Sequence, residues 1–225
     1  MKITVLTLFP DMFPAIINDS IIKRAKENNL VEVNIINFRD FSNNKHNTVD
    51  DTPYGGGAGM LLQVEPIYKA LISIPDYKEA YKILLTPQGK KYNQNIAKDL
   101  IKHDHIILIC GHYEGFDERV REYIDMEISI GDYVLTGGEI AALVVIDSIV
   151  RLIPGVLGSK ESYEHDSFYE DSLDYPQYTK PREFNGVKVP DVLLSGNHKE
   201  IAKWREEMKL KSTVERRPDL LKKIK

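Results

Sequence analysis

Three glycine-rich segments, each directly following a run of apolar residues, are the part of the sequence best suited to bind a small molecule. They span residues 86–89, 110–115 and 131–138. If the apolar runs are strands of one parallel sheet, these segments lie together at the carboxyl ends of the strands, where open α/β sheets bind ligands. Glycine lets the backbone approach a ligand closely, and the N–H and C=O groups of such loops can bind the edge of an adenine. One glycine loop is an ordinary turn, but three in consecutive units favour a small-molecule site.

The usual phosphate-binding motifs do not accompany these loops. The first apolar run ends in Phe9-Pro10-Asp11 without G-x-G-x-x-G, which disfavours a dinucleotide site, and the lack of G-x-x-x-x-G-K-[ST] disfavours an NTPase. A further segment, residues 53–60, holds four glycines. We interpret it as a flexible lid or as a surface for nucleic-acid backbone and bases.

The residues that must position these loops alternate between strand-like and helical patterns. We expect strands at residues 3–9, 31–38, 82–85, 105–110 and 127–130. We expect helices near residues 19–28, 65–72, 94–101 and 117–124. This alternation predicts βα units and therefore an α/β fold with a largely parallel sheet covered by helices.

A strongly apolar helix is predicted at residues 140–153. Thr136 and Glu139 form a capping-box pattern before it, and Pro154-Gly155 ends it. A helix that is apolar on most faces must be buried, either by its own domain or by a second subunit.

Composition is that of an ordinary soluble globular protein, with 42% hydrophobic and 28% charged residues among 225. No apolar run is long enough to span a membrane, and the apolar start of the chain, which stops at Pro10-Asp11, is interpreted as a strand and not as a signal peptide. The single cysteine, Cys110, excludes an intrachain disulfide framework and a multi-cysteine zinc site. We expect a cytoplasmic protein.

Charge is distributed unevenly along the chain. The net charge is −4, yet residues 199–225 hold ten Lys and Arg against five Asp and Glu. Such a basic tail can face nucleic-acid phosphates, although lysine-rich helical tails also serve solubility.

Helical patterns are found in the same part of the chain. Asn197 and Glu200 form a cap pair, Ile201, Trp204 and Met208 share one helix face, and a short helix is expected at residues 219–224. Residues 159–174, with six acids and one lysine, have a linker composition.

Taken together, these segments closely resemble the bacterial tRNA (guanine-N1)-methyltransferase family, TrmD, of the SPOUT superfamily. The match runs in family order over nearly the whole chain, through residues 7–10, 54–60, 86–89, 110–120, 130–139, 153–158, 166–168 and 203–205. The most specific part combines residues 111–115, Gly-His-Tyr-Glu-Gly, with residues 130–139, Ile-Gly-Asp-Tyr-Val-Leu-Thr-Gly-Gly-Glu.

The resemblance implies three parts. Residues 1–158 would form an α/β domain with a largely parallel sheet and a deep C-terminal trefoil knot, a rare exception to the rule against threaded chains. Residues 159–174 would form an acidic, mobile linker or lid, and residues 175–225 a small all-helical, tRNA-binding domain. The resemblance also implies a homodimer with an active site shared between subunits.

The resemblance further implies that S-adenosylmethionine is the cofactor, held by the three glycine loops. By motif, its contacts would be Leu85, Thr86, Pro87, Gly111, Tyr113, Glu114, Gly115, Ile130, Gly131, Asp132, Tyr133, Val134, Leu135, Gly137 and Gly138. Use of Mg²⁺ is implied by resemblance alone, without a protein ligand that can be named, and no metal-ligand spacing stands out.

Methylation of guanine N1 needs a general base beside N1 and a cation or donor beside O6. The resemblance places these roles on Asp166 and Arg151. From the residues alone, an ordinary ion pair with Asp147 four residues earlier is the default explanation of Arg151, and Asp166 is one of six acids in the linker.

The expected tRNA contacts lie in three segments of the chain. Near the C-terminus, basic residues are expected to bind the anticodon arm. The full set is Gly57 and Gly59 in the glycine-dense loop, His165 in the linker, and Lys199, Lys203, Arg205, Lys209, Lys211, Arg216 and Arg217 near the C-terminus. Trp204 fits either a base-stacking role or, at helical spacing with Ile201 and Met208, a core role. By resemblance the target is the guanine immediately 3′ of the anticodon.

Two positions depart from the family pattern, because many relatives have arginine where this chain has His112 and proline where it has Ala58. Neither position carries a group assigned to the chemistry. The alternative functions are a methyltransferase acting on another RNA and a non-enzymatic tRNA-binding protein, and a nucleotide-dependent oxidoreductase is disfavoured by the missing phosphate motif.

Overall fold

The computed structural model describes residues 1–158 and 166–221. The chain divides into two compact units, Met1–Gly158 and Ser159–Lys225. Residues 159–165 of the predicted acidic linker, His165 among them, and the end of the short helix predicted at 219–224 lie outside the described residues.

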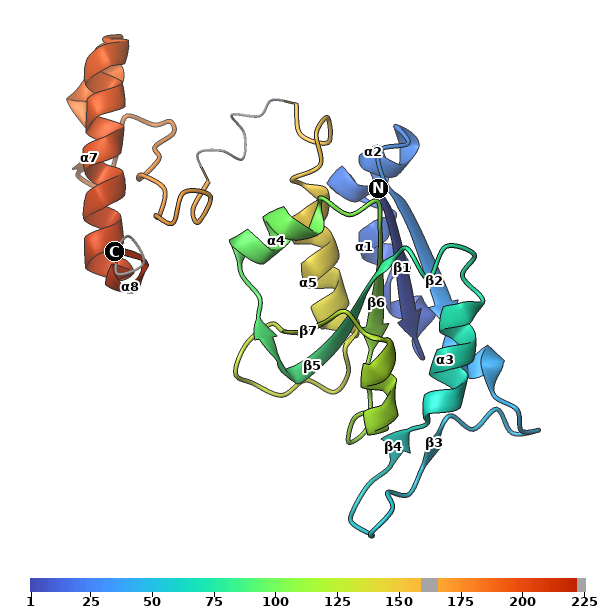
Figure 1. Ribbon diagram of the computed structural model, residues 1–225. Coiled ribbons are helices and arrows are strands. Elements are labelled where there is room, and N and C mark those ends of the chain that lie inside the picture. Colours follow the sequence, from blue (N-terminus) through green and yellow to red (C-terminus); the bar gives the residue numbers. More distant parts are fainter. Residues whose placement is uncertain (159–165, 222–225) are drawn as a thin grey trace. The chain divides into compact units, whose positions relative to one another are not determined.

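The first unit is built on one five-stranded sheet with strand order β2-β1-β6-β5-β7 (Figure 1). Every neighbouring pair in it is parallel. The prediction of a mixed α/β fold with a largely parallel sheet is therefore confirmed. The strands are β1 (Lys2–Thr7), β2 (Glu32–Asn37), β5 (Tyr81–Lys91), β6 (His105–Cys110) and β7 (Met126–Ser129).

Helices cover both faces of this sheet (Figure 1). The α-helices are α1 (Pro14–Ile17), α2 (Ser20–Glu27), α3 (Val64–Ile72), α4 (Gln94–Leu100) and α5 (Glu139–Val150). Short 3₁₀ helices are η1 (Pro10–Met12), η2 (Phe38–Phe41) and η3 (Glu118–Tyr123). The helix expected near 117–124 is therefore present, but with the tighter 3₁₀ winding.

Alternating side chains of the strands build a core on each face, because successive residues of a strand point to opposite faces. Leu6 of β1 and Ile107 of β6 join the cluster that packs under α3. Their neighbours Val5 and Leu108 are fully buried on the opposite face, where α5 contacts β1 and β6. The last residue of β1, Thr7, shares the face of Val5.

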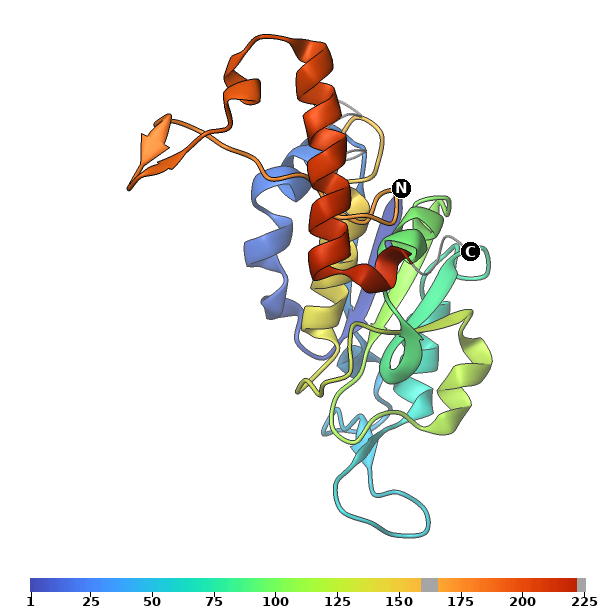
Figure 2. The ribbon, with the colours of Figure 1, turned by 90° about the vertical axis from the view of Figure 1, so that its left-hand side faces the viewer.

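Two very short strands, β3 (Asp50–Asp51) and β4 (Leu61–Leu62), pair antiparallel at the base of the glycine-dense loop. Figures 1 and 2 both show this loop projecting beyond the five-stranded sheet. Tyr54, near its tip, is fully exposed.

The N-terminus of α5 differs from the predicted capping box. Gly138 is the N-cap residue, and no side chain makes a cap hydrogen bond there. The prediction failed because the Glu139 side chain turns into the core, where its Oε1 accepts a hydrogen bond from Thr7. The helix also ends earlier than expected, at Val150, with Arg151 as its C-cap residue.

The second unit contains a long helix, α7 (His198–Arg216), the short helix α8 (Pro218–Leu221) and a 3₁₀ turn, η4 (Asp191–Leu194). It also contains a two-stranded antiparallel hairpin, β8 (Glu183–Phe184) with β9 (Val187–Lys188). The expectation of an all-helical module was therefore wrong. An Asn-Gly turn, Asn185-Gly186, with both residues at positive φ, closes the hairpin.

The long helix α7 is capped at its start, and two of its side chains, Trp204 and Thr213, contact the irregular segment that precedes it. The Asn197 side chain caps α7 by accepting a hydrogen bond from the Glu200 N–H at 3.4 Å, as predicted. Trp204 is half-buried and lies 6.4 Å from the Tyr178 ring, centroid to centroid. The fully buried Thr213 accepts a hydrogen bond from the Leu173 N–H at 3.0 Å. Trp204 is only partly buried, and both its core role and its base-stacking role therefore stay predictions.

None of the helices in the described part of the chain has the length and apolar character needed to span a bilayer.

A buried histidine ties β6 to the start of the sheet. His105 Nε2 lies 2.9 Å from Thr4 Oγ1, and its Nδ1 lies 2.8 Å from Asp76, which also accepts from Lys2 at 3.0 Å. A neutral ring with the proton on Nδ1 satisfies all three contacts. Burial lowers the pKa of His105, and the Asp76 carboxylate opposes that shift in part.

This network predicts a pH-dependent stability. Because its pKa is lowered on folding, His105 takes up a proton more readily in the unfolded chain, so the free energy of unfolding should fall as pH drops below about 6.5. In the His105→Gln variant the free energy of unfolding should fall less between pH 7.5 and pH 5.5 than in the wild type, as measured by chemical denaturation. His46→Gln, at an exposed histidine, should keep the wild-type slope. Equal slopes for wild type and His105→Gln would contradict this interpretation.

Candidate functional site

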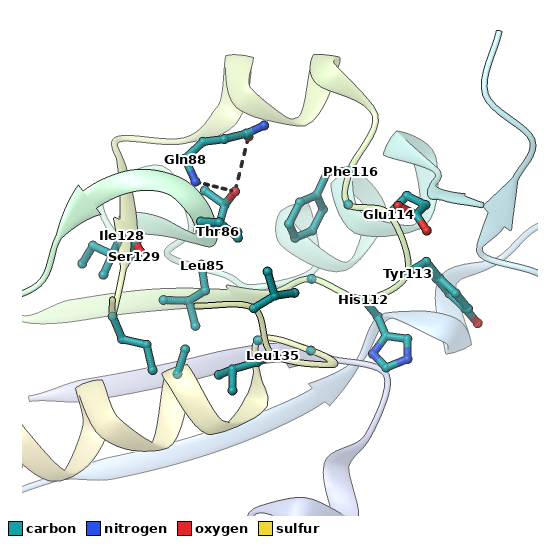
Figure 3. Close-up of a pocket in the computed structure, with 18 of the residues that line it drawn as sticks. Leu85, Thr86, Gln88, His112, Tyr113, Glu114, Phe116, Ile128, Ser129 and Leu135 are labelled. Carbon is teal, nitrogen blue, oxygen red and sulfur yellow. Dashed lines mark hydrogen bonds between the residues drawn. The ribbon is translucent and has the colours of Figure 1, made fainter. Parts of the chain in front are cut away.

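A cavity of about 480 Å³ lies at the carboxyl ends of β5, β6 and β7. Volumes of this size are typical of small-molecule sites. Figure 3 shows Leu85, Phe116 and Leu135 gathered around its centre, with His112 and Tyr113 to one side. The loops that line the cavity are the three glycine-rich segments, so the structure brings together the residues that the sequence singled out.

Fourteen of the fifteen residues expected to bind the cofactor line this cavity. The exception is Asp132, whose side chain is 87% exposed and pairs with Lys91 at 3.1 Å. The fourteen are Leu85, Thr86, Pro87, Gly111, Tyr113, Glu114, Gly115, Ile130, Gly131, Tyr133, Val134, Leu135, Gly137 and Gly138.

Further lining residues were missed by the sequence analysis. Gln88, His112 and Thr136 lie inside the three predicted glycine segments but were not named as contacts, and others directly adjoin a predicted contact, which was the available signal. The rest come from a neighbouring strand or helix and had no local signal. The missed residues are Leu61, Gln88, His112, Phe116, Glu118, Arg121, Ile128, Ser129, Thr136 and Ala141.

The first glycine loop is part of a strand. β5 continues to Lys91, and its pairing with β7 shifts register between Leu85 and Lys90. At Gly89, an added Cβ would lie 2.4 Å from the backbone nitrogen of Ile128. The irregularity therefore lets the chain bulge at residues 86–89 beside the cavity and then rejoin β7.

The second and third glycine loops touch backbone to backbone. The Gly138 N–H donates to the Gly111 carbonyl at 2.8 Å, and His112 and Gly137 form an isolated antiparallel bridge. A Cβ at Gly138 would lie 2.8 Å from Cys110 Cα. Only glycine permits this approach, which forms one wall of the cavity.

The charged groups at the rim pair with one another. Arg121 donates through Nε to Glu127 at 2.9 Å, and its guanidinium also contacts Glu118 and Gln88. The hydrogen bond with Glu127 raises the pKa of Arg121. Arg121 is therefore a permanently charged group fixed at the edge of the cavity.

Cys110 is not equipped to act as a nucleophile. Its side chain is fully buried, and burial together with the charge of Glu139 raises the pKa of its thiol. A thiol in such surroundings stays protonated and unreactive.

The glycine-dense loop adjoins the cavity. The Glu114 N–H donates to the Met60 carbonyl at 3.0 Å, and the Leu62 N–H donates to the Gly115 carbonyl at 2.9 Å. A Cβ at Gly59 would lie 2.3 Å from Glu114 Cγ. Gly59 is thus packed against a cavity residue, whereas Gly57 meets only Pro53, at 3.7 Å.

The two residues expected to carry the chemistry belong to different units. Arg151 is the partly buried C-cap residue of α5 in the first unit. Asp166 is partly buried in the second unit, where its carbonyl accepts from the Tyr169 N–H at 3.2 Å.

Most of the basic residues expected to contact RNA are exposed on α7. Lys199, Lys203, Arg205 and Arg216 are exposed, and Lys209 pairs with Glu170 at 2.9 Å.

Two of the basic residues also contact aromatic rings of the same unit. The Arg205 guanidinium lies 4.9 Å from the centroid of the Tyr175 ring. Arg217 pairs with Asp219 at 2.7 Å and lies 5.4 Å from the Phe168 ring centroid. These contacts hold Arg205 and Arg217 near the segment that carries Asp166.

Among the described residues, no group of three or more His, Cys, Asp and Glu side chains is placed to hold a metal ion.

An α/β unit with a glycine-lined cavity at its strand ends, joined to a second unit that carries exposed basic residues on its long helix, defines a ligand-binding protein. The comparisons with known proteins are more specific. The chain belongs to the tRNA (guanine-1)-methyltransferase TrmD family, whose model matches residues 1–223.

Curated relatives match over almost their whole length. A protein from Staphylococcus carnosus named tRNA (guanine-N(1)-)-methyltransferase is 57% identical over 224 residues, covering 99% of this chain and 91% of the relative. Proteins of the same name from Carboxydothermus hydrogenoformans and Dehalococcoides mccartyi are 56% and 58% identical, covering 99% and 100% of this chain and 88% and 92% of the relatives.

The close contact between the second and third glycine loops predicts that one added methyl group at Gly138 lowers the stability of the protein. Gly138→Ala should lower the free energy of unfolding by about 1–3 kcal/mol, because its Cβ meets backbone that cannot move independently. The φ of −81° at Gly138 suits alanine, so the loss would arise from contact alone. Gly158→Ala is the matched control, since nothing lies within 4 Å of its Cβ. Equal stability of the two variants in chemical denaturation would show that the loops do not meet as described.

Proposed function

We propose that this chain is an enzyme that methylates N1 of a guanine in tRNA, using S-adenosylmethionine as methyl donor. The observation that carries the proposal is the cavity formed by three glycine loops in a chain whose relatives are named tRNA (guanine-N(1)-)-methyltransferase. The proposed target is the guanine immediately 3′ of the anticodon, and the proposed compartment is the cytoplasm, where tRNA is found.

The cavity suits an adenine nucleoside. Leu85, Ile130 and Leu135 supply apolar surface for a planar base, and the glycine loops supply backbone N–H and C=O groups for its edge. At Gly111 an added Cβ would lie 2.7 Å from the Phe116 ring, so glycine at this position lets the Phe116 ring pack directly against the loop that lines the cavity. When bound, S-adenosylmethionine supplies an electrophilic methyl group on its sulfonium sulfur.

Asp166 and Arg151 are the proposed catalytic residues. Guanine N1 becomes a good nucleophile when its proton is removed, and a carboxylate such as Asp166 accepts that proton. The negative charge that then develops on O6 is stabilised by a guanidinium, and Arg151 at the end of α5 would supply it.

A homodimer would bring the two catalytic residues together. Asp166 lies in the second unit and the cavity in the first, so one protomer would deliver Asp166 to its partner's cavity. Residues 159–174 would close over the guanine as a lid. Ile140 and Val144, which are 48% and 41% exposed on α5, supply apolar surface for the partner.

The exposed basic residues of α7 would bind the phosphates of the anticodon arm, and Gly57 and Gly59 would contact the RNA beside the cavity. Such contacts make binding salt-dependent, because bound phosphates release counterions. His165 belongs to the proposed lid, and Mg²⁺ would act without a dedicated cluster of protein ligands in the described part of the chain.

A trefoil knot within residues 1–158 is also part of the proposal. β7 lies at the sheet edge beside β5, yet α5, which follows it, packs on β1 and β6. Between them the chain runs beside the loop that follows β6, where Gly138 bonds Gly111. This return path supports a threaded connection.

The first experiment is to methylate a tRNA transcript with purified protein and S-adenosylmethionine labelled at the methyl group. The label should appear on N1 of the guanine 3′ of the anticodon, located by nuclease digestion and mass spectrometry. Label on a ribose 2′-hydroxyl would instead identify a methyltransferase of another specificity. Binding of tRNA without any affinity for the methyl donor would identify a non-enzymatic tRNA-binding protein.

Asp166→Ala should retain affinity for S-adenosylmethionine while kcat falls by about 10²–10⁴, the usual contribution of a general base. Glu170→Gln is the matched control, because Glu170 is an exposed acid of the same segment that pairs with Lys209. Isothermal titration and single-turnover kinetics measure the two effects. Near-normal turnover of Asp166→Ala would remove Asp166 from the mechanism.

A further inference from the structure

Glu139 is a buried carboxylate that the chemistry proposed above does not use. It is only 3% exposed, at the first residue of α5, whose other buried residues are all aliphatic. Burying an ionised carboxylate costs several kcal/mol unless its contacts offset the loss of water. The contacts of its two oxygens therefore show what the residue does.

One carboxylate oxygen is bound to the end of β1. Thr7 Oγ1 donates to Glu139 Oε1 at 2.7 Å, and the same Thr7 oxygen accepts from the Phe9 N–H at 2.9 Å. Thr7 is fully buried at the last position of β1. This chain of hydrogen bonds fixes the start of α5 to β1, an interior strand of the sheet.

The other carboxylate oxygen lies beside the loops that line the cavity. A Cβ built on Gly137 would be 2.3 Å from Glu139 Oε2 and 2.9 Å from His112 Nδ1. These two atoms therefore flank the same face of Gly137. The His112 ring in turn contacts the Phe9 ring, with 4.9 Å between centroids and the planes tilted by 54°, so the segment that follows β1 contacts the loop after β6 directly.

Glu139 and Thr7 do not themselves line the cavity, whereas Gly111, His112 and Gly137 do. Any effect of the carboxylate on a ligand must therefore pass through the loops. The bond from Gly138 N–H to Gly111 O couples the loops next to Glu139. Holding such backbone groups in place before a ligand arrives improves affinity, because less ordering is left to occur on binding.

We propose that Glu139, held by Thr7, is a positioning residue for the methyl donor, whose carboxylate fixes residues 131–138 against the loop that follows β6. The identity of the ligand rests on the function proposed above. A purely structural role, such as stabilising the N-terminus of α5 by its negative charge, would lower the stability of the chain without changing the affinity of the folded protein.

The test compares three variants at a temperature where circular dichroism shows each to be folded. Thr7→Val removes the hydroxyl donor with little change in shape, and Glu139→Gln removes the charge. Each should raise the dissociation constant of S-adenosylmethionine about tenfold, the usual effect of losing a hydrogen bond to a buried charge. Ile146→Val, at a buried residue of α5 that does not line the cavity, is the matched control and should bind like wild type.

Two further readouts separate positioning from stability. The KM for S-adenosylmethionine should rise in Thr7→Val and Glu139→Gln while the KM for tRNA stays near the wild-type value. The double variant should bind no more weakly than the worse single variant, because both substitutions disrupt one unit.

The inference is overturned if wild type binds S-adenosylmethionine and both Thr7→Val and Glu139→Gln bind it equally well, even if their melting temperatures fall. If Glu139→Gln does not fold, the affinity of Thr7→Val for S-adenosylmethionine tests the inference alone. Failure of wild type to bind the methyl donor would instead overturn the proposed function, and this inference with it.

Discussion

The close approach of two backbone segments, at Gly111 and Gly138, is the constraint on which the cavity depends. Their hydrogen bond is 2.8 Å long, and no side chain fits at Gly138 without meeting Cys110. Because the segments follow different strands, the contact fixes the loop after β6 against the loop after β7. The bulge of β5 at residues 86–89 then completes the lining from the neighbouring strand.

The two units hold different parts of the proposed reaction. The first contains the cavity and Arg151, and the second contains Asp166 and the exposed basic residues of α7. On the proposed mechanism the complete site would depend on assembly, since a donor pocket without the acid would bind its ligand but transfer the methyl group slowly. The buried Glu139 stabilises the pocket from within the first unit alone.

The strands and the glycine loops were predictable because their signals are local. Apolar runs of suitable length predicted all five strands of the parallel sheet, the glycine segments predicted where a ligand site lies, and the family resemblance named the fourteen expected contacts that line the cavity. Features that depend on distant partners were not predictable. β5 extends to Lys91 because it pairs again with β7 after the bulge, and Glu139 was given a capping role because its partner, Thr7, lies 132 residues away. The hairpin at Asn185 was missed because each of its strands has only two residues, too few to show an alternating pattern.

Hydrogen exchange with and without S-adenosylmethionine tests most directly whether the glycine loops are the ligand site. Backbone amides of residues 111–115 and 131–138 should become protected when the methyl donor is added, because the ligand would bind to them and exclude water. The loop at residues 42–48, which contributes nothing to the cavity, should exchange at an unchanged rate. Protection elsewhere with no change in the two glycine loops would contradict the account.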